Sequence, residues 1–140
     1  MEANVSNPRG TVLVVEDEPF VRLMAADVLA RAGFDVLEAG NADEALHILE
    51  TRADVRLIFT DVDMPGSIDG LGLAESIDKR WPRIGVVFTS GHRRHMARIP
   101  AGSCFLAKPY AATDLVRQIE EAMFAAAPAM VYSSRIAAHI

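Results

Sequence analysis

Residues 12–19 of the chain read VLVVEDEP, four apolar residues followed by three acids and a proline. Such a short, continuously apolar run is typical of a strand that is buried on both faces of a parallel sheet. Pro19 is typical of the first turn of a helix, where the backbone N–H that proline lacks would have no helical partner. The stretch therefore predicts a strand that passes directly into a helix, with carboxylates at the junction.

The same alternation of strand and helix recurs four more times along the chain. Short apolar runs predict five strands, at residues 12–15, 34–38, 57–60, 84–89 and 103–106. Five βα units joined by right-handed crossovers predict an α/β fold, a doubly wound parallel sheet with helices on both faces.

Helical spacing and capping residues place the helices between these strands. Gly33 ends the first helix, whose expected apolar face is formed by Val21, Met24, Ala25, Val28 and Leu29. Asn41 followed by Glu44 predicts the cap of a second helix. A third helix ends before Trp81, a short fourth spans about residues 92–98, and the fifth carries Leu115, Ile119, Ala122 and Met123.

Composition and charge narrow the functional classes. At 140 residues, with 51% hydrophobic and 24% charged residues, the chain has the composition of one soluble globular domain. Its net charge of −5 supplies no basic field, so neither nucleic acid nor a membrane is expected as a partner. The single cysteine, Cys104, lies in an apolar run and is expected to be a free thiol that packs as a small hydrophobe. No signal pattern and no membrane-spanning run is present, which predicts a cytoplasmic protein.

The expected organisation is a flexible N-terminal arm at residues 1–10, one domain at residues 11–125 and a C-terminal tail of uncertain structure at residues 126–140. The tail is too apolar for a solvated linker and too short for a domain. It could pack back onto the domain, extend a helix or meet a partner, and the sequence does not choose among these. The initiating Met1 and the short arm favour a free-standing protein.

Polar residues stand where the predicted strands end. Glu16 and Asp17 follow the first strand, Asp61 the third, Ser90 the fourth and Lys108 the fifth. Ligands of doubly wound sheets bind beyond the carboxyl ends of the strands, so these side chains are expected to converge if the first and third strands are neighbours. Three carboxylates that close repel one another unless a cation joins them, and Mg²⁺ prefers oxygen ligands. Asp61 could then attack phosphorus, with Lys108 and the Ser90 hydroxyl beside the transferred group.

These residues also carry a resemblance to a known family. Over roughly residues 11–125 the chain resembles the receiver domain of two-component response regulators, of the CheY-like, stand-alone type. The matching motifs are VLVVEDEP at 12–19, DVDMPG at 61–66 with DG at 69–70, TSG at 89–91 and FLAKP at 105–109, each at its expected strand end. The resemblance implies a flavodoxin-like (βα)5 sandwich with a five-stranded sheet in the order 2-1-3-4-5.

The resemblance implies roles for the acidic residues. Asp61 would be the phosphoacceptor, phosphorylated by a histidine kinase or a histidine phosphotransfer protein. Glu16, Asp17, Asp61 and the backbone carbonyl of Asp63 would hold Mg²⁺. The protein would then be a phosphoacceptor switch in a phosphorelay or two-component system, and an enzyme only toward its own phosphorylation and dephosphorylation.

The resemblance further implies a switch. Lys108 would pair with the phosphoryl group, Ser90 would move to hydrogen-bond it, and Phe105 would change rotamer. Thr89 is the rival for the hydroxyl role, although the small Gly91 after Ser90 fits the family better. Output would be a downstream protein contact made by the fourth helix, the fifth strand and the fifth helix, a region that includes the basic residues His92, Arg93, Arg94, His95 and Arg98.

Three departures from the family pattern bear on rates. Glu16 stands where the commonest form has Asp, which could shift the geometry of Mg²⁺ binding slightly. The segment at residues 66–70 is one residue longer than usual. Asp63 and His92 occupy positions that tune dephosphorylation in this family, so the phosphoryl lifetime is not predicted.

Several alternatives stay open at this stage. The chain could be a receiver cut from a hybrid histidine kinase or phosphorelay protein, or a receiver-like module that has lost phosphorylation. Asp61-Val62-Asp63 also resembles the nucleophile motif of haloacid-dehalogenase-like phosphatases, although the order of motifs argues against that class. A flavin carrier is disfavoured because three acids follow the first strand. The cognate kinase, the target, the pathway and the formation of a homodimer are not predicted.

Overall fold

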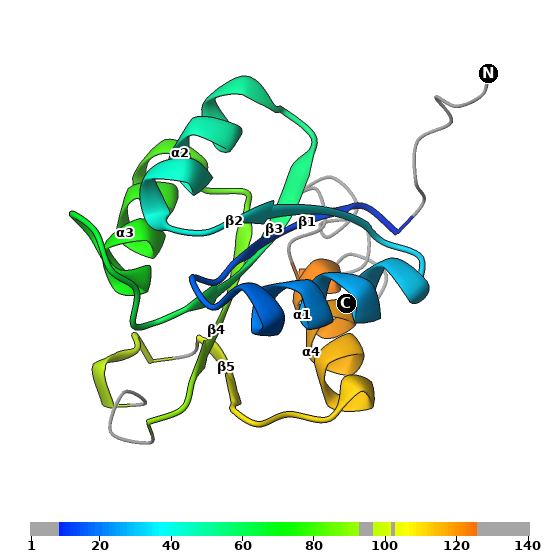
Figure 1. Cartoon of the computed structure of the whole chain (residues 1–140). Helices are drawn as coiled ribbons and strands as arrows, with labels where there is room; N and C mark the ends of the chain where they lie inside the picture. Colours follow the sequence, from blue (N-terminus) through cyan, green and yellow to red (C-terminus); the bar gives the residue numbers. More distant parts are fainter. Residues whose placement is uncertain (1–8, 93–96, 102, 126–140) are drawn as a thin grey trace, which may run out of the picture.

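A sheet of five parallel strands lies at the centre of the protein in a computed structural model, which describes residues 9–92, 97–101 and 103–125 (Figure 1). The strands are β1 (Thr11–Val15), β2 (Asp35–Ala39), β3 (Val55–Asp61), β4 (Gly85–Ser90) and β5 (Cys104–Ala107). Their order in the sheet is β2-β1-β3-β4-β5, which confirms the predicted doubly wound topology. Each strand begins and ends within two residues of its predicted bounds.

Four helices are present in the described part of the chain: α1 (Pro19–Arg31), α2 (Ala42–Thr51), α3 (Gly70–Arg80) and α4 (Ala112–Ala125). The helix labelled α4 is the fifth one that the sequence predicts. The predicted fourth helix, at about residues 92–98, falls largely on residues 93–96, which lie outside the described residues, as do the basic residues Arg93, Arg94 and His95. Residues 1–8 of the predicted arm at residues 1–10, and the tail at residues 126–140, lie outside them as well.

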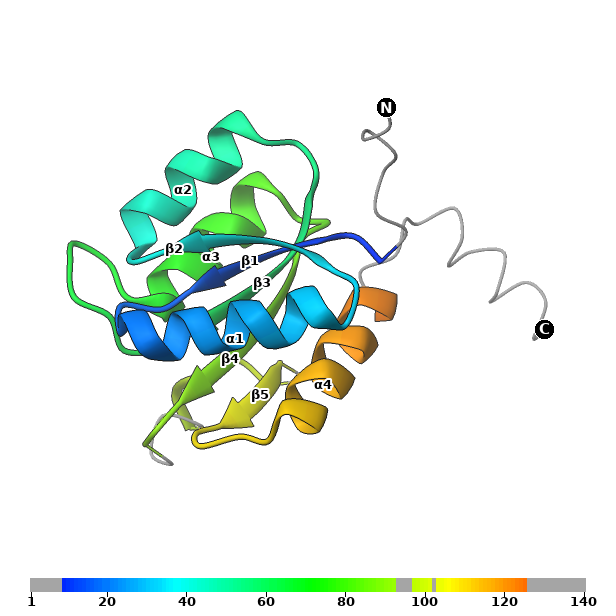
Figure 2. The same ribbon diagram turned by 45° about the vertical axis from the view of Figure 1, so that its right-hand side comes forward.

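The alternation of side chains along β1 divides the core into two halves. Val12 and Val14 face one side with residues of α1 and α4, whereas Leu13 and Val15 face the other side with residues of α2 and α3. All four of these β1 residues are at most 1% exposed. The central strand is therefore buried on both faces, as its apolar run predicts, and Figure 2 shows the two helical layers on either side of the sheet.

Capping explains where the helices start and stop. Pro19 opens α1 as predicted, and Gly33 after its end takes a φ of +101°, a conformation that suits glycine. The N–H of Glu44 donates to Asn41 Oδ1 at 2.8 Å, which confirms the predicted cap of α2. The expected apolar face of α1 needs one correction: Met24 is 68% exposed, and Ala26 is buried in addition to Ala25 and Leu29.

Cys104 is half-buried on β5 and packs against the core half that contains α1 and α4. Over the residues that the structure describes, no helix has the length and apolar content needed to cross a bilayer.

Candidate functional site

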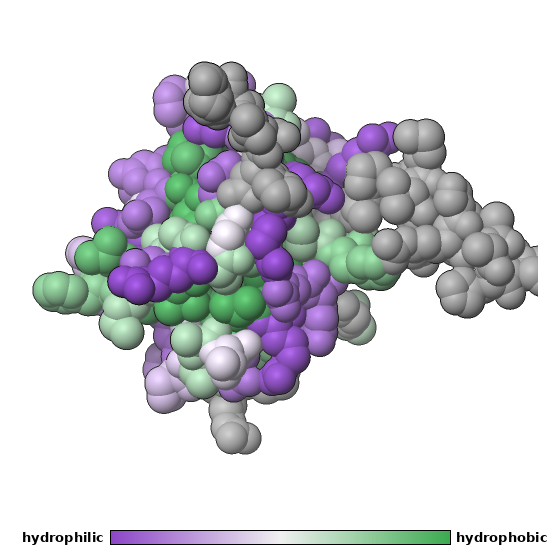
Figure 3. Space-filling view, turned by 90° about the vertical axis from the view of Figure 1, so that its right-hand side faces the viewer, coloured by the Kyte–Doolittle hydropathy of each residue, from purple (hydrophilic) through white to green (hydrophobic). Residues whose placement is uncertain are grey.

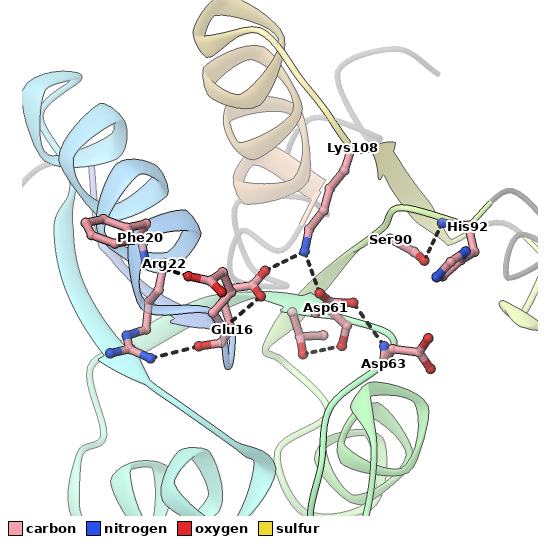
Figure 4. Close-up of polar contacts among 10 residues, drawn as sticks. Glu16, Phe20, Arg22, Asp61, Asp63, Ser90, His92 and Lys108 are labelled. Atoms are coloured by element: carbon pink, nitrogen blue, oxygen red, sulfur yellow. Dashed lines mark hydrogen bonds and ion pairs between the residues drawn. The ribbon is translucent and has the colours of Figure 1, made fainter.

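Acidic residues from two neighbouring strands meet at the carboxyl end of the sheet (Figure 4). Val15 pairs with Thr60 in the parallel ladder of β1 and β3, so Glu16 and Asp61 each stand one residue beyond this pair. Carboxylate oxygens of Glu16, Asp17 and Asp61 all lie within 4.8 Å of one another. The sheet register thus produces the convergence that the sequence predicts.

Lys108 reaches the same point from β5, two strands away from β3. Its Nζ donates to Glu16 Oε1 at 2.7 Å and to Asp61 Oδ2 at 2.6 Å. Its backbone N–H donates to the carbonyl of Ser90 at 3.0 Å, which continues the pairing of β5 with β4. The lysine is therefore held at its backbone and aimed across β4 at the two carboxylates.

Burial and the neighbouring charges shift the pKa values of Glu16 and Lys108 in this cluster. Glu16 is 4% exposed and Asp61 6% exposed, whereas Asp17 lies at the surface. Burial raises the pKa of Glu16 above its ordinary value, and the nearby charge of Asp61 adds to the rise although Lys108 opposes it. Burial would lower the pKa of Lys108, but its bonds to Asp61 and Glu16 outweigh this and raise the pKa. The ammonium group therefore stays charged between two carboxylates.

Backbone groups fix the free oxygens of the buried acids. Asp61 Oδ1 accepts the N–H of Asp63 at 2.9 Å, and Glu16 Oε2 accepts the N–H of Glu18 at 3.2 Å. Behind Asp61 the first residue of α3, Gly70, packs so tightly that an added Cβ would lie 1.9 Å from the Asp61 carbonyl oxygen. The segment that carries Asp61 is thus held by close backbone contact from α3.

A comparison with known protein families identifies the family of this fold. Residues 12–120 match the family described as the response regulator receiver domain. The chain belongs to this family. A transcriptional regulatory protein of Pseudomonas aeruginosa, AruR, is 32% identical over 133 residues, which cover 84% of this chain and 54% of AruR.

Two further relatives connect the receiver domain to two-component signalling. The sensor kinase CckA of Brucella abortus is 37% identical over 116 residues, which cover 79% of this chain and 12% of CckA. The crystal structure of the receiver domain of NtrX from Brucella abortus is 36% identical, has a TM-score of 0.74, and is matched over 80% of this chain and 97% of that domain. The chain spans about half the length of AruR and a small part of CckA.

The acidic cluster of this receiver domain offers only oxygen donors. The carboxylates of Glu16 and Asp61 are buried, whereas that of Asp17 lies at the surface. Such a donor set suits Mg²⁺, which binds through one or two carboxylates and keeps other positions for water or phosphate. Receiver domains bind Mg²⁺ at a cluster of this kind, and the residues here fit that ion.

The hydroxyl residues of the receiver domain lie at the end of β4. Ser90 is 2% exposed, and its Oγ accepts the N–H of His92 at 3.0 Å. Thr89, the rival for the hydroxyl role, pairs with Asp61 in the ladder of β3 and β4. Its buried Oγ1 has no hydrogen-bond partner among the described residues. Both hydroxyls thus lie beside the strand that carries Asp61.

Sequence reasoning missed two residues that support the site. Arg22 donates from Nη1 to the backbone carbonyl of Glu16 at 2.9 Å and from Nε to Glu38 at 3.2 Å, so it ties the β1 end to β2. Tyr110 packs edge-on against Phe59 with their ring centroids 5.7 Å apart, which anchors the segment after Lys108. Arg22 is half-buried in the first turns of α1, and no local sequence pattern distinguishes it from a solvated arginine.

Proposed function

We propose that this receiver domain is a phosphoacceptor switch, in which Asp61 takes a phosphoryl group from a phosphohistidine of a histidine kinase or a histidine phosphotransfer protein. One observation carries the proposal: Lys108 Nζ lies 2.6 Å from Asp61 Oδ2 while the carboxylates of Glu16 and Asp17 lie beside it. This arrangement combines a carboxylate nucleophile with the positive charge that a phosphoryl group needs. The protein would act in the cytoplasm. It would assist only its own phosphorylation and dephosphorylation and would not turn over a separate substrate.

The reaction exchanges one bond for another. An Asp61 oxygen attacks phosphorus in line and forms an O–P bond, while the N–P bond to the donor histidine breaks. The imidazole nitrogen leaves with the electron pair and takes up a proton from solvent. Asp61 becomes an acyl phosphate, which water later hydrolyses to inorganic phosphate and the free carboxylate.

Charged groups of the chain assist this transfer. Glu16, Asp17, Asp61 and the backbone carbonyl of Asp63 would hold Mg²⁺, which when bound neutralises charge on the phosphoryl oxygens. Lys108 would exchange its bond to Asp61 for one to a phosphoryl oxygen, and its bond to Glu16 keeps its ammonium group in place meanwhile. The chain would thus assist phosphoryl transfer mainly by positioning Asp61 and by neutralising the charge of the phosphoryl group.

Signalling would follow from the hydroxyl at the end of β4. When Ser90 Oγ turns to donate to the phosphoryl group, it gives up its bond to the N–H of His92. The segment after β4 would then move, and Phe105, which is half-buried on β5, would change rotamer. The contact surface for a downstream protein would be formed by residues 92–98, β5 and α4.

Phosphorylation by a small donor tests the proposal without the unidentified kinase. The protein is incubated with Mg²⁺ and acetyl phosphate, and its intact mass is read for wild type and Asp61→Ala. We expect one added phosphoryl group in wild type and none after addition of EDTA or in the variant. An undiminished mass shift in Asp61→Ala would refute the assignment.

A haloacid-dehalogenase-like phosphatase is not favoured, because the family match covers residues 12–120 as a receiver domain. The similarity to CckA indicates that a domain of this kind also occurs within a sensor kinase. The phosphorelay alternative therefore uses the same site, and Asp61 would pass its phosphoryl group on to a histidine rather than to water. Turnover of a phosphate monoester by the purified protein would instead support the phosphatase.

A further inference from the structure

A hollow of about 660 Å³ lies at the opposite end of the sheet, where β3 and β4 begin. We name it the amino-end hollow; its lining includes the apolar residues Leu49, Val55, Trp81 and Ile84 and the arginines Arg56 and Arg83. Figure 3 faces this end of the molecule, and hydrophobic residues are visible there between hydrophilic ones. Its volume falls in the range of roughly 300–1,000 Å³ that is typical of small-molecule sites.

The two arginines of the amino-end hollow differ from the other arginines that the structure describes. Seven others have a carboxylate partner: Arg9, Arg22, Arg31, Arg52, Arg80, Arg98 and Arg117. Within the described part of the chain, Arg56 and Arg83 have none. Two cations without a carboxylate thus border one apolar hollow in a protein whose net charge is −5.

The acids near the amino-end hollow are already engaged. Glu50, which also lines it, accepts from Arg80 at 2.9 Å, and Asp54 accepts from Arg52 at 2.6 Å. Neither acid therefore neutralises Arg56 or Arg83. The hollow keeps a net positive charge beside an apolar wall.

Packing also positions the groups that would meet a ligand. Arg56 lies on β3, and a Cβ added at Gly10 would lie 3.3 Å from its Cδ and 3.4 Å from Met123 Cε, so its stem is held between the start of β1 and α4. Trp81 follows α3 directly, and the Arg80 guanidinium lies 4.3 Å from the centroid of its ring. A half-buried arginine with a held stem and an aromatic ring beside a second guanidinium thus both line the amino-end hollow.

From these observations we propose that the amino-end hollow binds a small organic anion with an apolar body, a carboxylate on an alkyl chain or on an aromatic ring. The apolar body would lie against Leu49, Val55 and Trp81. The carboxylate would accept from Arg56 and Arg83, whose planar guanidinium groups match it in geometry. This site is independent of the phosphoacceptor site at the other end of the sheet.

Fluorescence of Trp81 tests the proposal directly, because it is the single tryptophan of the chain and lines the hollow. The full chain is titrated with octanoate, with octan-1-ol as the neutral match and with acetate as the head group alone. We expect saturable change with octanoate and at least about tenfold weaker binding of the other two, since the charge-assisted bonds and the apolar contact are both needed.

Substitutions then locate the site. Arg83→Gln and Arg56→Gln should each weaken octanoate binding by about tenfold or more, whereas Arg31→Gln, an exposed and paired arginine on α1, should not change it. Arg83 is exposed, so its variant stays informative if Arg56→Gln folds poorly.

Each other outcome would overturn the proposal. No saturable change at millimolar octanoate, equal binding of octan-1-ol, or unchanged binding in Arg83→Gln would each remove the specific anion site. Binding of an acidic aromatic peptide without binding of octanoate would make the hollow a protein-docking surface, and the small-ligand proposal would be wrong.

Discussion

At the carboxyl end of the sheet a lysine lies between two buried carboxylates. At the amino end two arginines border an apolar hollow, and neither has a carboxylate partner among the residues that the structure describes. In the first arrangement each charged group has an opposite charge within the chain. Under the proposed function, these charges would rearrange around an incoming phosphoryl group. The second arrangement has an excess of positive charge, for which residues 9–92, 97–101 and 103–125 supply no carboxylate partner. The contrast teaches that the two ends of one doubly wound sheet can differ in charge. Only the charged residues at the carboxyl end could be predicted from the sequence motifs that follow the strands.

The largest expected effect comes from backbone contact at the carboxyl end. Gly70→Ala places a Cβ 1.9 Å from the Asp61 carbonyl oxygen, so α3 or the end of β3 has to move. We expect a loss of about 3 kcal/mol or more in the free energy of unfolding, measured by urea denaturation. Gly91→Ala is the matched control, because an added Cβ there meets no atom within 4 Å. A Gly70→Ala protein as stable as this control would contradict the close packing behind Asp61.

The next effect tests the paired cation. Lys108→Ala leaves Glu16 and Asp61 buried beside one another without their shared ammonium group. In EDTA we expect a loss of about 3 kcal/mol in the free energy of unfolding, because a buried charge without its partner is poorly solvated. Added Mg²⁺ should recover part of this loss and should stabilise the variant more than wild type. Equal stabilisation of both proteins by Mg²⁺ would contradict the prediction, because it would mean that the ion and Lys108 do not neutralise the same carboxylates.

A smaller effect concerns pH. Burial raises the pKa of Glu16 above 4.5, so the folded metal-free protein holds this proton more tightly than the unfolded chain. The stability that this proton contributes is fully present below pH 4.5 and is lost as pH rises through the folded pKa. Denaturation of wild type and Glu16→Gln in EDTA, over a series of pH values, should therefore show wild type losing stability relative to the variant as pH rises. A constant difference across the series would contradict the raised pKa.

The smallest effect is expected at the amino end. Arg83→Gln removes an exposed cation that has no carboxylate partner in the described structure, so no ion pair is broken. The free energy of unfolding should change by less than about 0.5 kcal/mol. Comparison of this value with that of Lys108→Ala measures how differently the two ends use a cation. A loss in Arg83→Gln as large as in Lys108→Ala would remove the contrast.

The carboxyl end was predictable because its residues follow their strands directly. Glu16 stands next to Val15 and Asp61 ends β3, so the parallel register alone brings their side chains together. Lys108 was predictable for the same reason, since β5 ends at Ala107. The strand bounds followed from apolar runs that are buried on both faces.

The amino end could not be predicted in the same way. The amino-end hollow combines the end of α2, the first residues of β3 and the segment after α3, which are distant in sequence. Arg56 and Arg83 become exceptional only when the partners of the other arginines are known. Met24 likewise illustrates the limit of periodicity, because helical spacing groups it with Ala25 and Val28 although its side chain is 68% exposed.

One measurement tests the central claim most directly. Wild-type protein is phosphorylated with acetyl phosphate and Mg²⁺, the acyl phosphate is reduced with borohydride, and the resulting homoserine is located by peptide mass spectrometry. We predict a single homoserine, at position 61, and none when the phosphodonor is omitted. Homoserine at position 17 or 63 with an unmodified Asp61 would contradict the account.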